Sequence, residues 1–170
     1  MTSNPDLGPR EGWTEVQLVQ HVLGCKSFVS GDPTGDRLRV RYYRRDEDGS
    51  LLGRVWFGPE AEGPPGFVHG GALAAVLDEA LGGVAWMSGH PVVSVRLSTK
   101  NLRPLPLDSI VTVEARVERV QGSKVYTAGS IFDDAGNKYS EGESLYIELN
   151  RNRYGDAIAD VEKKFQASMR

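Results

Sequence analysis

Apolar and polar residues alternate with a period of two along much of this chain. Alternation of this kind is typical of strands that bury one face. Six segments are predicted as strands: 38–42, 51–57, 93–98, 111–118, 125–132 and 139–149. The last three are joined by short turns, which favours an antiparallel meander.

A helical period replaces the alternation between Gly71 and Met87. The apolar residues that form one continuous face there are Leu73, Val76, Leu77, Ala80, Leu81 and Val84. This pattern predicts one long helix, which ends at the turn residues 88–91. Shorter helices are expected at 14–23 and 156–169, and the first eleven residues are expected to form a loose tail.

These elements predict an α+β domain with a six-stranded sheet and one central helix. One helix covers only one face of such a sheet, so the remaining face or an edge strand is expected to bind a second copy of the chain. We divide the chain into an N-terminal tail with a short helix (1–30), a main domain (31–150) and a C-terminal helical tail (151–170).

Composition narrows the class of protein. The 170 residues carry a net charge of -3, with 25% charged residues, which suits one soluble domain without the basic field that nucleic acids attract. The apolar runs are too short to span a bilayer, and the N-terminus lacks a signal-peptide pattern. Cys25 is the single cysteine and the three histidines are scattered. We therefore expect a cytoplasmic domain with no metal and no cofactor.

The clearest candidate for chemistry is the segment His69-Gly70-Gly71, directly before the long helix. The first amides of a helix have no internal acceptors and lie at the positive end of its dipole. Glycines without side chains allow a ligand oxygen to approach these amides, as an oxyanion hole requires. The simpler alternative is that the glycines only permit a tight turn and that His69 only packs.

Asp78 is the second candidate. At helical spacing it shares a line with the small residues Gly71, Ala75, Gly82 and Ala85. A ligand or a second subunit can approach a carboxylate on such a face closely, and the desolvation raises its basicity. The alternative is an ordinary surface aspartate, and for the neighbouring Glu79 we prefer that interpretation.

The segment 69–78, with the sequence HGGALAAVLD, resembles the HGG-to-Asp signature of hotdog-fold acyl-CoA thioesterases, both phenylacetate-pathway enzymes and animal thioesterase superfamily members. The resemblance extends from Leu38 to Leu149 and includes VSVRL at 93–97 and LRPLPL at 102–107. It implies a curved six-stranded antiparallel sheet wrapped around the helix. It also implies a homodimer, alone or as a dimer of dimers, with active sites at the subunit interface.

The resemblance further implies roles for single residues. The amide of Gly70, alone or with that of Gly71, would hold the thioester carbonyl oxygen, and His69 would orient the thioester. Asp78 of the opposite subunit would act as general base or as nucleophile. Ser94 would lie beside the attacking water; its alternative is an outward-facing strand serine.

The substrate-binding residues are assigned on the same basis. An acyl chain would lie along Leu73, Leu77 and Leu81, for which core packing is the alternative. Lys100 and Arg103 would bind the phosphates of coenzyme A, for which solvated surface charge is the alternative. Coenzyme A would enter only as part of the substrate.

One position departs from the pattern. Related enzymes often have Asn or Gln six residues before the histidine, where this chain has Gly63. The leading hypothesis is hydrolysis of a fatty or aromatic acyl-CoA to free acid and CoA. A non-catalytic acyl-CoA binder is the alternative that Gly63 favours, and a dehydratase or hydratase of the same fold ranks lower.

Overall fold

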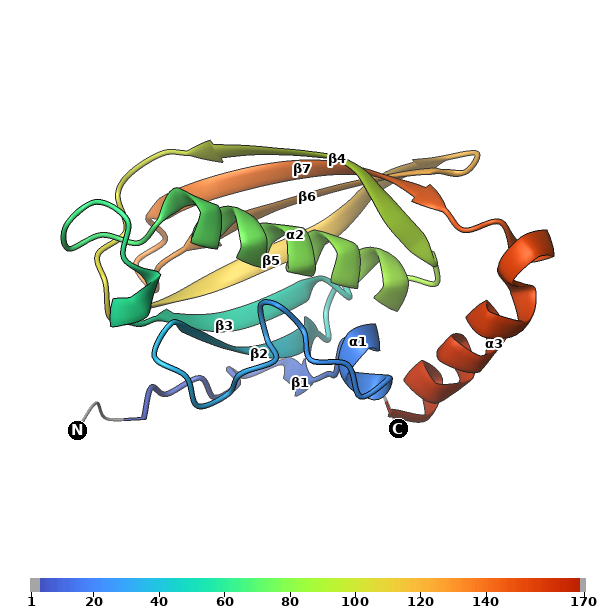
Figure 1. Ribbon diagram of the computed structural model, residues 1–170, viewed down its shortest axis with the longest axis horizontal. Helices are drawn as coiled ribbons and strands as arrows, with labels where there is room; N and C mark the ends of the chain where they lie inside the picture. The colour runs from blue at the N-terminus through green and yellow to red at the C-terminus, as the bar shows by residue number, and fades with distance from the viewer. Residues whose placement is uncertain (1–3, 169–170) are drawn as a thin grey trace.

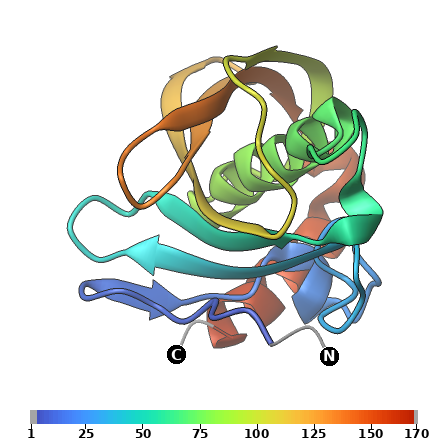
Figure 2. The ribbon, with the colours of Figure 1, turned by 90° about the vertical axis from the view of Figure 1, so that its left-hand side faces the viewer.

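The computed structural model describes residues 4–168, and one antiparallel sheet curls around the long helix α2 (Figures 1 and 2). The strands are β1 (Trp13–Glu15), β2 (Leu38–Arg45), β3 (Leu51–Phe57), β4 (Val92–Asn101), β5 (Ser109–Gln121), β6 (Lys124–Phe132) and β7 (Lys138–Glu148). The helices are α1 (Val19–Val22), α2 (Gly70–Met87) and α3 (Arg151–Ser168), with a 3-10 turn at Pro59–Ala61. The strand order β1-β2-β3-β5-β6-β7-β4 confirms the α+β fold with a central helix, although the sheet has seven strands where six were predicted.

The concave face of the sheet and the apolar face of α2 form one core. The predicted stripe of α2 is buried, and residues that alternate along β5, β6 and β7 meet it from the sheet. Gly129 and Gly142 are paired in register on this face. A Cβ atom at Gly129 would lie 3.3 Å from Leu81, and one at Gly142 would lie 3.3 Å from Leu77. The two glycines therefore let the helix pack close to the middle of the sheet.

The region before β2 differs from the prediction. A helix was expected at 14–23, but residues 13–15 form β1, which pairs with β2, and only Val19–Val22 is helical. Val16 and Leu18, on either side of Gln17, are buried in the same core as α2. The error arises because the three residues of β1 carry too little alternation to distinguish a strand from the first turn of a helix.

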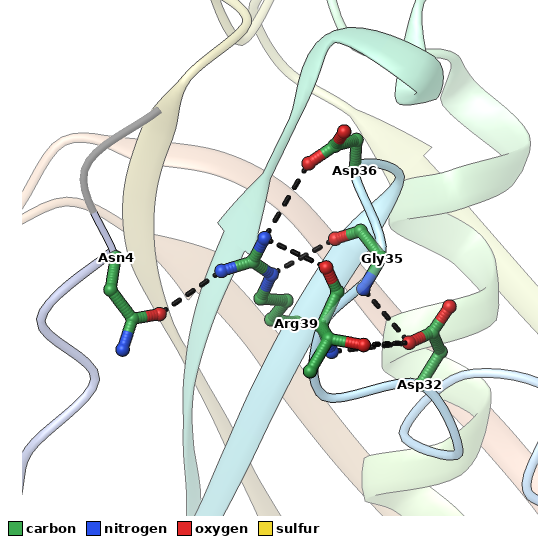
Figure 3. A network of polar contacts seen from close by, with 6 residues as sticks. Asn4, Asp32, Gly35, Asp36 and Arg39 are labelled. Atoms are coloured by element: carbon green, nitrogen blue, oxygen red, sulfur yellow. Dashed lines mark hydrogen bonds and ion pairs between the residues drawn. The ribbon is translucent and has the colours of Figure 1, made fainter. Parts of the chain in front are cut away.

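The expected loose tail is also wrong for residues 4–11. Leu7 is buried, and its carbonyl oxygen accepts a hydrogen bond from the Tyr43 hydroxyl. Arg39 donates to the Asn4 side chain at 3.0 Å and to the carbonyl oxygen of Gly35 at 2.9 Å. Figure 3 shows these contacts. The Arg39 guanidinium also lies 4.8 Å from the centre of the Trp56 ring. This network holds the N-terminal segment and the loop before β2 against the sheet.

The C-terminal helix α3 is confirmed, although it begins at Arg151 rather than at residue 156. Ile158 and Phe165 are its buried apolar residues, and the helix packs against α1 beside the end of the sheet (Figure 1). Met169, which the predicted helix included, lies outside the described residues.

Strand β4 forms the edge of the sheet next to β7, at the top of Figure 1. Eight of its ten residues are exposed, on both faces of the strand. Val93 and Val95 are 51% and 58% exposed, and a bulge interrupts the pairing with β7 between Ser94 and Arg96. An edge of this kind leaves backbone hydrogen-bonding groups open to another chain.

Candidate functional site

The N-terminus of α2 is capped by the residue directly before it. His69 has an extended backbone, and its Nδ1 accepts a hydrogen bond of 2.9 Å from the amide of Gly71. The accepting Nδ1 carries no proton, so the ring proton of neutral His69 is on Nε2. The amide of Gly71 is therefore occupied, which corrects the expectation that it shares the binding of a carbonyl oxygen.

The amide of Gly70 has no such partner. Within residues 4–168 its N–H group has no hydrogen-bond acceptor. It lies at the first position of an eighteen-residue helix, where the positive end of the dipole favours a negative oxygen. Gly70 is thus the one amide of the predicted pair that remains open.

The loop before the helix explains the glycine at position 63. Its amide donates to the Phe67 carbonyl at 2.9 Å, and a Cβ atom at Gly63 would lie 2.7 Å from the Cα of His69. A side chain at this position would collide with the backbone that presents the helix N-terminus. No asparagine or glutamine fits position 63 without moving His69.

A cavity of about 540 Å³ opens at this end of the helix. Its lining is mostly apolar, with Arg103 among the few polar groups, and includes Pro64, Phe67, Val68, Gly70, Leu73, Asn101, Leu102, Arg103, Pro104 and Leu105. An apolar cavity with a few placed donors suits the uncharged part of a ligand.

Asp78 lies two turns further along α2, on its exposed side. Burial raises the pKa of its carboxyl, the charge of Glu79 raises it further, and a hydrogen bond from Tyr146 opposes the rise. A carboxylate with a raised pKa accepts a proton more readily, as a general base requires.

The neighbouring Glu79 is not the solvated acid that the sequence suggested. Its carboxylate accepts hydrogen bonds from the hydroxyls of Tyr42, at 3.0 Å, and Ser27. It therefore fixes α2 against β2 and against the loop between α1 and β2. Among residues 4–168, the Asp78 carboxyl has the Tyr146 hydroxyl as its one side-chain donor.

Ser94 lies on the helix-facing side of β4, because its register partner Tyr146 is buried on that side. Ser94 is nevertheless exposed, and its role beside the attacking water stays a prediction. The Tyr146 hydroxyl donates to the backbone oxygen of Asp78 at 3.3 Å. Burial, with the Asp78 carboxylate nearby, raises the pKa of Tyr146 to about 12, so the hydroxyl remains a donor at neutral pH. Asp78, Tyr146 and Ser94 thus belong to one region between α2 and β4.

The predicted substrate-binding residues divide into three groups. Leu73 and Arg103 border the cavity at the helix N-terminus together with Gly70. Leu77 and Leu81 are fully buried in the core, as the core alternative describes. Lys100 is paired with Glu141 on the opposite face of the sheet, so the structure does not bring it to the cavity.

Gly70 and Asp78 do not reach the same point in one chain. They are eight residues apart in a continuous helix, which at a rise of 1.5 Å per residue is about 12 Å along the axis. A nucleophile and an oxyanion donor must both lie within roughly 3 Å of the same carbonyl group. The two groups can act together only if the Asp78 comes from another copy of the chain.

The structure adds two residues that the sequence did not single out, Tyr146 and Asn101. The alternation along β7 predicts that Tyr146 faces the helix. Its contact with Asp78 could not be predicted, because it depends on how α2 crosses the sheet. Asn101 is the last residue of β4 and borders the cavity beside Gly70.

Neither a metal site nor a disulfide is part of this arrangement. Among the described residues no group of three or more His, Cys, Asp or Glu side chains could hold a metal ion. Cys25 is a free, exposed thiol. Within residues 4–168 no helix is both long enough and apolar enough to cross a membrane.

The chain is similar to known proteins both in sequence and in structure. Residues 65–140 match the family described as the thioesterase superfamily. Acyl-coenzyme A thioesterase THEM4 of Bos taurus is 34% identical over 148 residues, which cover 86% of this chain and 57% of the relative. The chain spans about half the length of the curated relatives it matches.

Two solved structures illustrate the fold. A crystal structure of a thioesterase superfamily protein is 35% identical with a TM-score of 0.61, and the match covers 64% of this chain and 56% of that one. A hypothetical thioesterase from Streptococcus pneumoniae TIGR4, solved with coenzyme A, has a TM-score of 0.59 at 18% identity, covering 67% of this chain and 87% of that one.

A curved antiparallel sheet packed around one central helix defines the hotdog class of folds. Within that class the chain belongs to the thioesterase superfamily, as its matched segment and its relatives show.

Proposed function

We propose that this protein is an acyl-CoA thioesterase that hydrolyses the thioester of a fatty or aromatic acyl-CoA to a free acid and CoA. The observation that carries the proposal is the open amide of Gly70, at the capped start of α2, beside an apolar cavity of about 540 Å³. The acyl-CoA thioesterases among the relatives support the substrate class.

In the proposed reaction the thioester carbonyl oxygen binds the Gly70 amide, where negative charge develops in the transition state. The carboxylate of Asp78 takes a proton from water as the water oxygen bonds to the carbonyl carbon. The carbon–sulfur bond then breaks, and the thiolate of CoA receives the proton. Direct attack by Asp78 is the second route: a carboxylate oxygen bonds to the carbonyl carbon, the carbon–sulfur bond breaks and the CoA thiolate leaves. Water then cleaves the resulting anhydride to the free acid and the Asp78 carboxylate, and a proton from that water goes to the thiolate.

Because Gly70 and Asp78 lie too far apart to act together within one chain, the proposed reaction requires a homodimer. The exposed edge strand β4 is the natural surface for pairing, since Val93 and Val95 lie there unburied and the Asp78 region lies between α2 and the same strand. Each site would combine Gly70 of one subunit with Asp78 of the other. Arg103, which borders the cavity, would bind a phosphate of CoA.

The test measures release of free thiol from a panel of acyl-CoA substrates of increasing chain length, with phenylacetyl-CoA included. We expect the Asp78→Asn variant to lose about 100-fold or more in kcat, the usual contribution of a general base. The control is Asp156→Asn, which makes the same chemical change at an exposed position of α3.

Each other outcome has a definite meaning. Wild-type protein that binds acyl-CoA without releasing thiol would establish the non-catalytic binder. Wild-type turnover that persists in Asp78→Asn would support thioester hydrolysis and would exclude Asp78 as its general base or nucleophile.

A further inference from the structure

Asn101 brings a side-chain amide to the N-terminus of α2 from a different element. It is the last residue of β4 and lies on the helix-facing side of the sheet, where its register partner is Ser140. Gly70 and Asn101 both border the cavity of about 540 Å³.

The orientation of this amide is fixed by a buried hydroxyl. Ser140 is fully buried, and its Oγ donates a hydrogen bond of 2.9 Å to Oδ1 of Asn101. The oxygen end of the amide is therefore occupied, and Nδ2 lies at the Gly70 end. Nδ2 is 2.9 Å from the position that a Cβ atom on Gly70 would take. Among residues 4–168 this Nδ2 has no acceptor.

The two open donors are close enough to share one oxygen. From standard backbone geometry, Nδ2 lies within roughly 5.4 Å of the Gly70 nitrogen. Two nitrogens that each bind the same oxygen at about 2.9 Å are separated by no more than about 5.8 Å. The absence of a side chain at Gly70 leaves room for that oxygen beside the helix terminus.

We infer that Asn101 is a second oxyanion donor: its Nδ2–H group and the Gly70 amide together bind the substrate carbonyl oxygen. The inference rests on the proposed thioester hydrolysis and adds a catalytic residue to it. Asn101 exchanges no proton. It stabilises the negative charge that moves onto the carbonyl oxygen when the carbon is attacked, and it returns to its starting state when the carbon–sulfur bond breaks.

Ser140 is a positioning residue in this arrangement. Without its hydroxyl, the amide of Asn101 is free to rotate and to offer its oxygen instead of its nitrogen to the substrate. We expect Ser140→Ala to lower kcat by less than removal of the amide does, because part of the population keeps the productive orientation.

The first experiment compares Asn101→Ala, Asn101→Asp and Ser98→Ala in thiol release from the best acyl-CoA of the panel. Loss of one oxyanion donor lowers kcat by roughly 100-fold or more, and we expect KM to change little. Asn101→Asp keeps the shape of the side chain but replaces its donors with a carboxylate, so we expect a loss at least as large. Ser98, on the opposite face of the same strand, is the matched control.

The second experiment measures how binding changes the carbonyl group of the substrate. Phenylacetyl-CoA labelled with ¹³C at the carbonyl is bound to the Asp78→Asn protein, and its stretching frequency is measured by infrared difference spectroscopy. We expect binding to lower the frequency, and the added Asn101→Ala substitution to reverse part of that shift without abolishing binding.

The outcomes separate the two hypotheses. Retained kcat in Asn101→Asp, or a carbonyl shift that Asn101→Ala leaves unchanged, would overturn the role of Asn101 while thioester hydrolysis remained. A wild-type protein without turnover would overturn the proposed function, and the infrared shift would then decide on its own whether Asn101 contacts the carbonyl. A labelled probe that does not bind would overturn both.

Discussion

His69 determines which amides of α2 remain available. Its Nδ1 binds the amide of Gly71, and its backbone carbonyl accepts from the amide of Ala72 at 2.9 Å. With acceptors counted over residues 4–168, only the Gly70 amide is left open at the start of the helix. The HGG motif made this region a candidate, but it did not indicate that the histidine would occupy one of the two amides.

The raised pKa of the Asp78 carboxyl predicts that ionisation of this group lowers the stability of the folded protein. The ionised carboxyl is less favourable in the folded state than in the unfolded chain, because burial raises its pKa above the usual 3.8. Stability is therefore lost as the pH rises from that value through the raised pKa. We expect Asp78→Asn to unfold at a higher temperature than wild type at pH 7, with a difference that shrinks towards pH 4.

Thermal unfolding monitored by circular dichroism at both pH values measures this difference, with Asp156→Asn as the matched control. A lower melting temperature for Asp78→Asn at pH 7 would show that Asp78 stabilises the fold. In the active protein, the same pKa makes kcat fall as the pH falls through it, because only the carboxylate acts as a base.

Among the elements, the strands and α2 were predictable because each carries its own pattern. Strand β3 has the predicted bounds, and α2 begins one residue earlier than predicted. Strand β1 was missed because three residues carry too little alternation, and its formation depends on the free edge of β2. The pairing of Gly129 with Gly142 could not be predicted from the sequence either, because the register of two strands depends on how they align with each other.

Strand β4 is the element on which we expect assembly to depend. A lysine at an exposed edge opposes pairing with another strand, because its charge would be buried in the interface. We expect Val95→Lys to convert the proposed dimer to a folded monomer and to abolish thiol release. Sedimentation velocity gives the oligomeric state, and circular dichroism checks the fold.

The matched control is Val120→Lys, which adds the same charge at a valine that is 45% exposed near the end of β5. Wild-type protein that is already monomeric and active would contradict the shared site. Val95→Lys protein that remains dimeric would assign the interface to another surface.

For the whole molecule, the separation of Gly70 and Asp78 predicts complementation between two inactive variants. Gly70→Pro removes the open N–H at a first helical position, where proline is tolerated, and the extended backbone of His69 suits a following proline. Mixed with Asp78→Asn, it forms dimers in which one site keeps both groups. Random pairing makes half of the dimers mixed, so about one quarter of wild-type activity is expected.

Thiol release measured before and after the two variants are unfolded and refolded together gives the answer. Refolding each variant alone is the control for recovery. If the mixture stays inactive while it forms mixed dimers, Gly70 and Asp78 of different subunits do not share a site.

The sequence by itself determined the local patterns: the strands after β1, the long helix, the glycines before it and the spaced aspartate. These follow from periodicity and from residue chemistry, which act over a few neighbouring positions. Only the tertiary structure decided that the Gly71 amide is occupied, that Tyr146 meets Asp78 and that Asn101 points its amide at Gly70. Those relations join residues from separate elements, and their geometry depends on strand register and on the path of α2 across the sheet.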